Sequence, residues 1–79
     1  METKVLEIIN DIRAAKSMNA VETLKATDNL RNDLGLTSFD LAELTVRIED
    51  EFDIEISDDA SQNIKTVGDL VSHIEELVK

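Results

Sequence analysis

Apolar residues recur at helical spacing in three stretches of the chain. Residues 3–16, 38–52 and 67–78 each place apolar side chains three and four positions apart, with charged residues on the remaining sides. In the middle stretch the apolar stripe consists of Leu41, Leu44, Ile48 and Phe52. This pattern predicts three amphipathic helices that bury one face each, with Thr3 as the N-cap of the first.

The segments between these stretches predict one long and one short connection. Residues 17–36 show no sustained period and are rich in turn-forming residues, so we expect a long loop with a short helical turn at residues 20–25. Ser57 is placed to cap a short helix that ends near Asn63. The expected fold is all-α: a small bundle of three main helices plus one short helix, forming a single domain over residues 1–79.

The start of the middle helix has a distinct local pattern. Gly35 ends the preceding structure, and Thr37 and Asp40 have the spacing of a capping box. Ser38 then occupies the first helical position, where its hydroxyl is expected to be exposed beside unpaired backbone N–H groups. The residues alone leave two interpretations open: Ser38 is an ordinary residue of a helix start, or it is displayed for esterification.

The same helix has a second apolar stripe on another side. Phe39, Ala42 and Val46 form this stripe, and Glu43 and Asp50 lie along one edge of it. Such a strip suits partner recognition, because the apolar side chains supply buried area and the acids supply steering. The alternative is that Phe39 folds under the preceding loop and Val46 contacts a neighbouring helix.

Composition excludes several classes of enzyme. The chain has no Cys, so it has no disulfide, zinc–thiolate site or intrinsic thiol nucleophile. Its single histidine, His73, has no sequence signal that places it near Ser38 as a base. The acidic stretch 50–59 lacks the glycine of an EF-hand loop and is interrupted by isoleucines, so we expect no specific metal site. We expect no catalytic activity.

The net charge of −10 is concentrated in one segment. Residues 37–59 contain nine acidic residues and one basic residue, whereas the flanking segments are each close to neutral. Nucleic acid and anionic membranes are therefore not expected as partners, whereas a basic protein surface is. The N-terminus has no signal-peptide pattern and no run is long enough to span a membrane, so we expect a cytoplasmic location or an organelle reached by a leader that has been lost. We also expect a monomer.

The complete pattern resembles the acyl carrier proteins, within the wider family of phosphopantetheine-binding carrier domains. The matching segments are Asp33-Leu34-Gly35-Leu36-Thr37-Ser38-Phe39, Ile48-Glu49-Asp50-Glu51-Phe52, Ile54-Glu55-Ile56-Ser57-Asp58 and Thr66-Val67-Gly68-Asp69-Leu70-Val71. The serine motif is weak by itself. Its combination with the later segments, at the spacing of the family, is specific and covers essentially the whole chain.

The resemblance implies a shuttle. A phosphopantetheinyl transferase would attach 4′-phosphopantetheine from coenzyme A to Ser38, and the thiol of this arm would carry acyl groups as thioesters. The helix after Ser38 would dock on basic patches of enzymes that transfer or modify acyl groups in fatty acid or related acyl and polyketide biosynthesis. The residues expected to contact these partners are Phe39, Ala42, Glu43, Val46 and Asp50.

Three residues depart from the usual family pattern. Thr37 stands where Asp is common, Phe39 where Leu is common, and Arg47 where many members have a small apolar residue. These differences leave open whether the chain is a fatty acid carrier or a specialised one. Two further alternatives stay open: an aminoacyl or peptidyl carrier, and an unmodified helical adaptor that binds a basic partner through residues 38–52.

Overall fold

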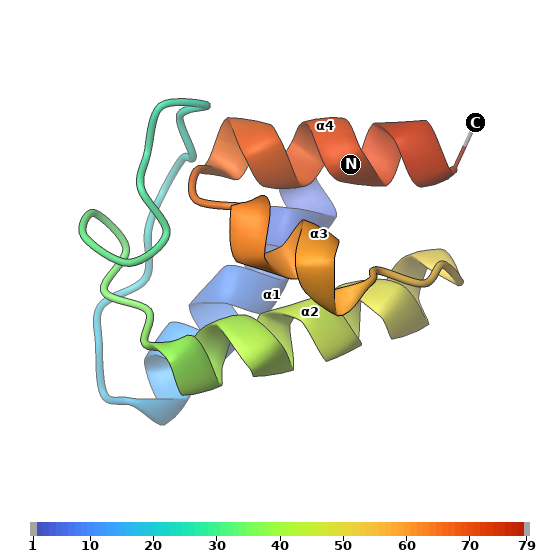
Figure 1. Cartoon of the computed structure of the whole chain (residues 1–79). Helices are drawn as coiled ribbons and strands as arrows, with labels where there is room; N and C mark the ends of the chain where they lie inside the picture. The colour runs from blue at the N-terminus through green and yellow to red at the C-terminus, as the bar shows by residue number, and fades with distance from the viewer. Residues whose placement is uncertain (1, 79) are drawn as a thin grey trace.

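The computed structural model describes residues 2–78 and shows four helices (Figure 1). They are α1 (Glu2–Ala15), α2 (Ser38–Phe52), α3 (Asp58–Asn63) and α4 (Val67–Leu77). The short α3 lies between α2 and α4, while α1 crosses behind them and the long α1–α2 loop closes one end. The described part of the chain contains no β-strand, so the predicted all-α bundle is confirmed.

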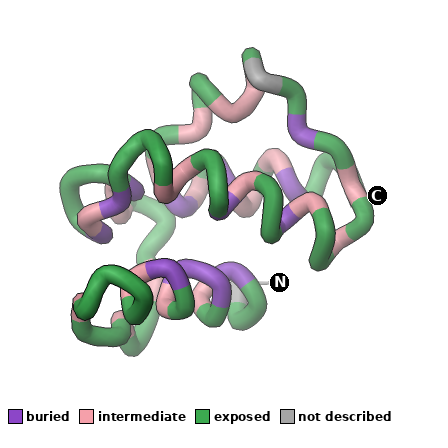
Figure 2. The backbone as a smooth tube through the Cα atoms, turned by 90° about the horizontal axis from the view of Figure 1, so that it is seen from below, coloured by how far each residue is buried: buried purple, intermediate pink, exposed green. Residues whose placement is uncertain are grey.

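The core is entirely aliphatic. Buried positions recur along one side of each long helix, alternating with exposed ones (Figure 2). The fully buried side chains are Val5, Ile9, Ile12, Leu30, Leu44, Ile48 and Ile74. No helix within residues 2–78 has both the length and the apolar character needed to cross a bilayer. The predicted stripes therefore face one common core, as expected for a small bundle.

Ion pairs between α1 and α2 define how the two helices run. Lys4 lies 3.6 Å from Glu51, Asp11 lies 3.7 Å from Arg47, and Lys16 lies 2.5 Å from Asp40. As the residue number rises from Lys4 to Lys16, the number of its partner in α2 falls from Glu51 to Asp40, so the two helices are antiparallel. This arrangement brings the C-terminal end of α1 beside the N-terminal end of α2.

The long loop is held to the bundle at several points. Leu30, Leu34 and Leu36 are buried in the core. The predicted helical turn at residues 20–25 is wrong: this segment contains no helix. Its backbone is instead bound by Asn10 of α1, whose side chain donates to the Val21 carbonyl at 3.0 Å and accepts from the Val21 N–H at 2.7 Å.

The middle of the same loop is joined to the start of α4. The N–H of Gly68 donates to the Ala26 carbonyl at 2.9 Å, and the N–H of Val67 donates to the Asp28 carbonyl at 3.0 Å. A further bond runs from the Leu30 N–H to the Lys65 carbonyl at 2.9 Å. These bonds fix the loop segment that lies next to the α3–α4 connection.

Helix boundaries agree with the sequence except at the N-terminus. α1 begins at Glu2, so Thr3 lies inside the helix and is not its N-cap. Ser57 caps α3 by accepting the Ala60 N–H, and Thr66 and Asp69 form the capping box of α4. The described chain forms no strand at Ile54–Ile56, and Ile56 is buried in the core.

Candidate functional site

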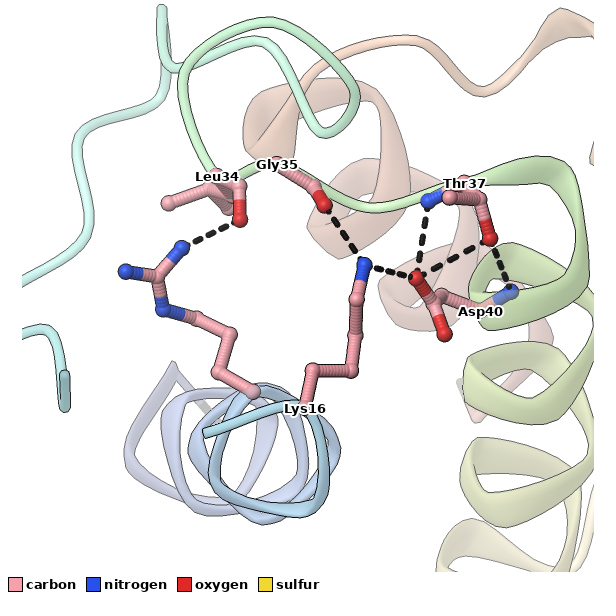
Figure 3. Close-up of polar contacts among 6 residues, drawn as sticks. Lys16, Leu34, Gly35, Thr37 and Asp40 are labelled. Carbon is pink, nitrogen blue, oxygen red and sulfur yellow. Dashed lines mark hydrogen bonds and ion pairs between the residues drawn. The ribbon is translucent and has the colours of Figure 1, made fainter. Parts of the chain in front are cut away.

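The N-terminus of α2 is fixed by a capping box. The Asp40 N–H donates to Thr37 Oγ1 at 3.2 Å, and the Thr37 N–H donates to Asp40 Oδ2 at 2.9 Å (Figure 3). The Thr37 hydroxyl also donates to Asp40 Oδ2 at 3.0 Å. The predicted cap is confirmed, and it makes Ser38 the first residue of α2.

Two basic residues at the end of α1 brace this cap. Lys16 Nζ donates to Asp40 Oδ2 at 2.5 Å and to the Gly35 carbonyl at 2.9 Å, and Arg13 donates to the Leu34 carbonyl (Figure 3). The pKa of Asp40 is lowered, chiefly by the hydrogen bond from Lys16 and then by the hydrogen bond from the Thr37 N–H. The α2 terminus is thus tied to α1 by charge-assisted bonds.

Gly35 provides the turn that leads into α2. Its φ angle is +70°, in the left-handed region where side chains with a Cβ are strained. A Cβ at this position would also lie 2.6 Å from Cε of Met18. Glycine therefore allows the turn at this position, in which the Gly35 carbonyl accepts a hydrogen bond from Lys16.

Ser38 is exposed beside this network and takes no part in it. Its hydroxyl has no hydrogen-bond partner within residues 2–78, and the N–H groups of Ser38 and Phe39 have no acceptor there. These N–H groups lie at the positive end of the α2 dipole, which favours an anionic substituent on the serine.

A groove of about 750 Å³ opens beside Ser38. One wall is formed by α2, and the others by the α1–α2 loop and by α3 with its connection to α4. The lining residues are Asn29, Arg31, Asn32, Ser38, Leu41, Ala42, Thr45, Ser61, Gln62, Ile64 and Lys65. A flexible group attached to Ser38 therefore has both open solvent and a mixed polar and apolar groove within reach.

The second stripe of α2 is exposed. Phe39 has 88% of its surface accessible and Val46 has 56%, and Ala42, Glu43 and Asp50 are exposed as well. Phe39 is not folded under the preceding loop, and Val46 is not covered by a neighbouring helix. Glu43 lies 3.5 Å from Arg47, which is therefore partly neutralised within the helix. The geometry required of a recognition strip is present.

Four basic residues of this region were not identified from the sequence. Arg13 and Lys16 contact loop and helix residues that lie 19 and more positions further along the chain. Arg31 and Lys65 both line the groove, and the segments that carry them are joined by the bond from the Leu30 N–H to the Lys65 carbonyl. No local spacing signals such contacts, and only the pairing of a basic α1 terminus with Asp40 could have been guessed from charge.

The structure offers no support for catalytic or metal chemistry in its described part. No group of three or more potential metal-ligating side chains occurs within residues 2–78. His73 of α4 lines a separate small pocket with Asp69 and Glu76, whereas Ser38 borders the groove at α2. Ser38 therefore has no histidine base in its own groove.

Comparison with known proteins decides the family. A family model described as the phosphopantetheine attachment site matches residues 4–74. The chain belongs to the phosphopantetheine-binding carrier family. A solved structure from Mycobacterium tuberculosis, described as an acyl carrier protein, is 38% identical, with 91% of this chain and 96% of that chain covered and a TM-score of 0.72. The acyl carrier protein of Enterococcus faecalis is 29% identical, covers 98% of both chains and gives a TM-score of 0.70.

The family establishes an acyl carrier-like protein that acts as a carrier and not as a catalyst. Its cofactor is covalently attached 4′-phosphopantetheine. The residues of this chain fit that group, because an exposed serine hydroxyl, free N–H groups and a groove meet at the start of α2. Members of the family interact with a phosphopantetheinyl transferase and with enzymes that handle acyl groups.

The cap predicts a pH-dependent contribution to stability. Because the pKa of Asp40 is lowered in the folded state, its stabilising effect is present above the pKa of the unfolded chain and is lost as pH falls through the folded value. Asp40→Asn should lower the free energy of unfolding by about 1–2 kcal/mol at pH 7. Urea denaturation should show this difference shrinking on acidification. The control is Glu75→Gln, an exposed change on α4; an Asp40→Asn deficit that is the same in acid as at neutral pH would contradict the role of the ionised carboxylate.

Proposed function

We propose that Ser38 is the attachment residue for 4′-phosphopantetheine. The supporting observation is the placement of its hydroxyl, exposed at the first position of α2 and on the rim of the groove. Other serines lie differently: Ser57 Oγ already accepts the Ala60 N–H at 3.2 Å, and Ser72 lies on α4. Ser38 is thus better placed for modification than Ser57 or Ser72.

The attachment step uses the Ser38 oxygen as nucleophile. Ser38 Oγ would bond to the phosphorus that bears pantetheine in coenzyme A, and adenosine 3′,5′-bisphosphate would leave. The hydroxyl proton passes to a base supplied by the transferase, because no histidine lines the groove beside Ser38. The arm supplies the thiol that a chain without Cys lacks, and acyl groups would travel on it as thioesters.

We further propose that the exposed side of α2 docks on basic surfaces of partner enzymes. Phe39 and Val46 provide apolar contact, Ala42 lets the partner approach closely, and Glu43 and Asp50 steer association. Because this strip begins next to Ser38, a partner that binds it would receive the attached group close to its own surface. The pathways served would be fatty acid biosynthesis or a related acyl or polyketide route.

Modification by a transferase tests the assignment of Ser38. The protein is incubated with coenzyme A and a phosphopantetheinyl transferase, and its intact mass is measured. The wild type should gain one phosphopantetheine and Ser38→Ala none. Ser57→Ala is the matched control and should be modified like the wild type, since it removes only the α3 cap hydroxyl. If Ser38→Ala gains the same mass, or the wild type gains none, the chain is an unmodified adaptor or is modified elsewhere.

Charge reversal tests the docking surface. Asp50→Lys should lower kcat/KM of the transferase about three- to tenfold at low ionic strength, because the partner loses an attractive charge. The loss should shrink at about 1 M salt, where the Debye length is about 3 Å. Glu75→Lys on α4 makes the same change in net charge and should have little effect. Equal losses in the two variants would show that net charge, and not the α2 surface, controls association.

A further inference from the structure

The groove beside Ser38 is lined by two cations, although the protein is strongly acidic. They are Arg31 and Lys65, and no acidic residue lines the groove among those whose side chains the structure describes. The chain as a whole has 18 acidic and eight basic residues, and the α2 helix that forms one wall is rich in acids on its outer sides. A groove whose only charged lining residues are cations is therefore unexpected in this chain.

The two cations are not used for structure. The side chains of Arg31 and Lys65 form no ion pair within residues 2–78, whereas the side chains of three other basic residues do: Lys4, Lys16 and Arg47. Arg13 binds backbone carbonyls instead. Lys25 likewise has no ion pair but lies outside the groove. Only Arg31 and Lys65 among these residues combine a side chain outside any ion pair with a place in the lining of the groove beside Ser38.

Backbone bonds join the two segments that carry these cations. The Asn29 side chain accepts the N–H groups of Arg31 at 2.9 Å and Asn32 at 2.8 Å, which orders a turn around Arg31. The adjacent Leu30 N–H donates to the Lys65 carbonyl at 2.9 Å. Arg31 and Lys65 therefore come from two segments that are joined directly, and their positions do not depend on a mutual side-chain contact.

Neighbouring acids are occupied by other donors. The carboxylate of Asp33 accepts the Asn29 N–H at 2.6 Å. The carboxylate of Asp69 accepts the N–H groups of Lys65 and Thr66, each at 3.2 Å, and these bonds, helped by the Lys65 charge, lower its pKa. Both acids are thus turned to backbone groups, and the cationic ends of Arg31 and Lys65 are left for a ligand.

We propose that Arg31 and Lys65 form a subsite for the terminal carboxylate of a dicarboxylic acyl group attached through Ser38. This inference rests on the proposed function of Ser38. The phosphate at Ser38 would be met by the free N–H groups of α2, so the cations remain for a second anion. Leu41, Ala42 and Ile64 supply apolar contact for the chain between the two anions, which consists of the pantetheine arm and the methylene groups of the acyl group. The guanidinium of Arg31 suits a carboxylate because it can bind both oxygens.

A chain that ends in a methyl group would use this groove poorly. Its apolar end would lie beside two charged side chains and gain no charge-assisted contact from them. A carboxylate of the same reach would instead gain two charge-assisted contacts. The subsite would therefore distinguish cargo by its terminal charge, in a carrier whose helix surface is otherwise acidic.

The experiment loads three different groups on the full chain. A phosphopantetheinyl transferase is supplied with coenzyme A, hexanoyl-coenzyme A or adipoyl-coenzyme A, and intact mass verifies each product. Amide chemical shifts of Arg31, Ile64 and Lys65 are then measured by ¹H–¹⁵N NMR. The adipoyl form should differ from the other two at these amides, and the difference should fall about two- to fivefold at about 1 M salt.

Variants separate the subsite from general effects. Arg31→Gln and Lys65→Gln should each reduce the adipoyl-specific shifts about two- to fivefold, whereas Lys25→Gln should leave them unchanged. The shift of the groove amide of Ile64 is compared in all variants, and a retained thermal midpoint verifies folding. Identical shifts in the hexanoyl and adipoyl forms, or the full shift already in the form with the arm alone, would overturn the proposal. The latter result would assign the cations to the phosphate. A chain that gains no mass at all would instead refute the proposed function of Ser38.

Discussion

The start of α2 at Thr37 is the constraint on which the rest of the structure depends. A helix turns by about 100° per residue, so sliding the sequence by one residue relative to a fixed cap would rotate every side chain of α2 by that angle. One oxygen, Asp40 Oδ2, accepts bonds from the Thr37 N–H, the Thr37 hydroxyl and Lys16 Nζ. This single acceptor joins the local cap to the end of α1 and thereby sets the register of the whole helix.

That register gives α2 three different sides. Leu44 and Ile48 are buried in the core, Leu41 and Thr45 line the groove, and Phe39 and Val46 face solvent with acids beside them. Ser38, the first residue of α2, lies beside both the groove and the exposed side. The acidic charge of the chain is divided accordingly: Asp40 is used inside the cap, and Glu43 and Asp50 are exposed on the outer side. Among the described residues, the charged side chains that line the groove are cations. One helix thus packs in the core, displays Ser38 at its start and exposes the surface proposed for docking.

The features that could be predicted from the sequence are those encoded locally. The capping box of α2 lies within four residues, so Thr37 and the start of α2 followed from spacing alone. The segment 20–25 was not predictable in this way, because Asn10, eleven positions before Val21, binds its backbone in an extended form. For the same reason the contacts of Lys16, and the meeting of Arg31 with Lys65, could not be read from the sequence. The conformation at these positions is determined by contacts between residues far apart in the chain, and local propensity carries no information about such contacts.

The central claim is that the capped start of α2 makes Ser38, and no other serine, the place where the arm is attached. Peptide mapping of the protein after incubation with coenzyme A and a phosphopantetheinyl transferase tests this claim most directly, since fragmentation assigns the added group to a residue. The account predicts that all of the added phosphopantetheine lies on Ser38. Its presence on Ser17, Ser57, Ser61 or Ser72, or its absence from every serine, would contradict the account.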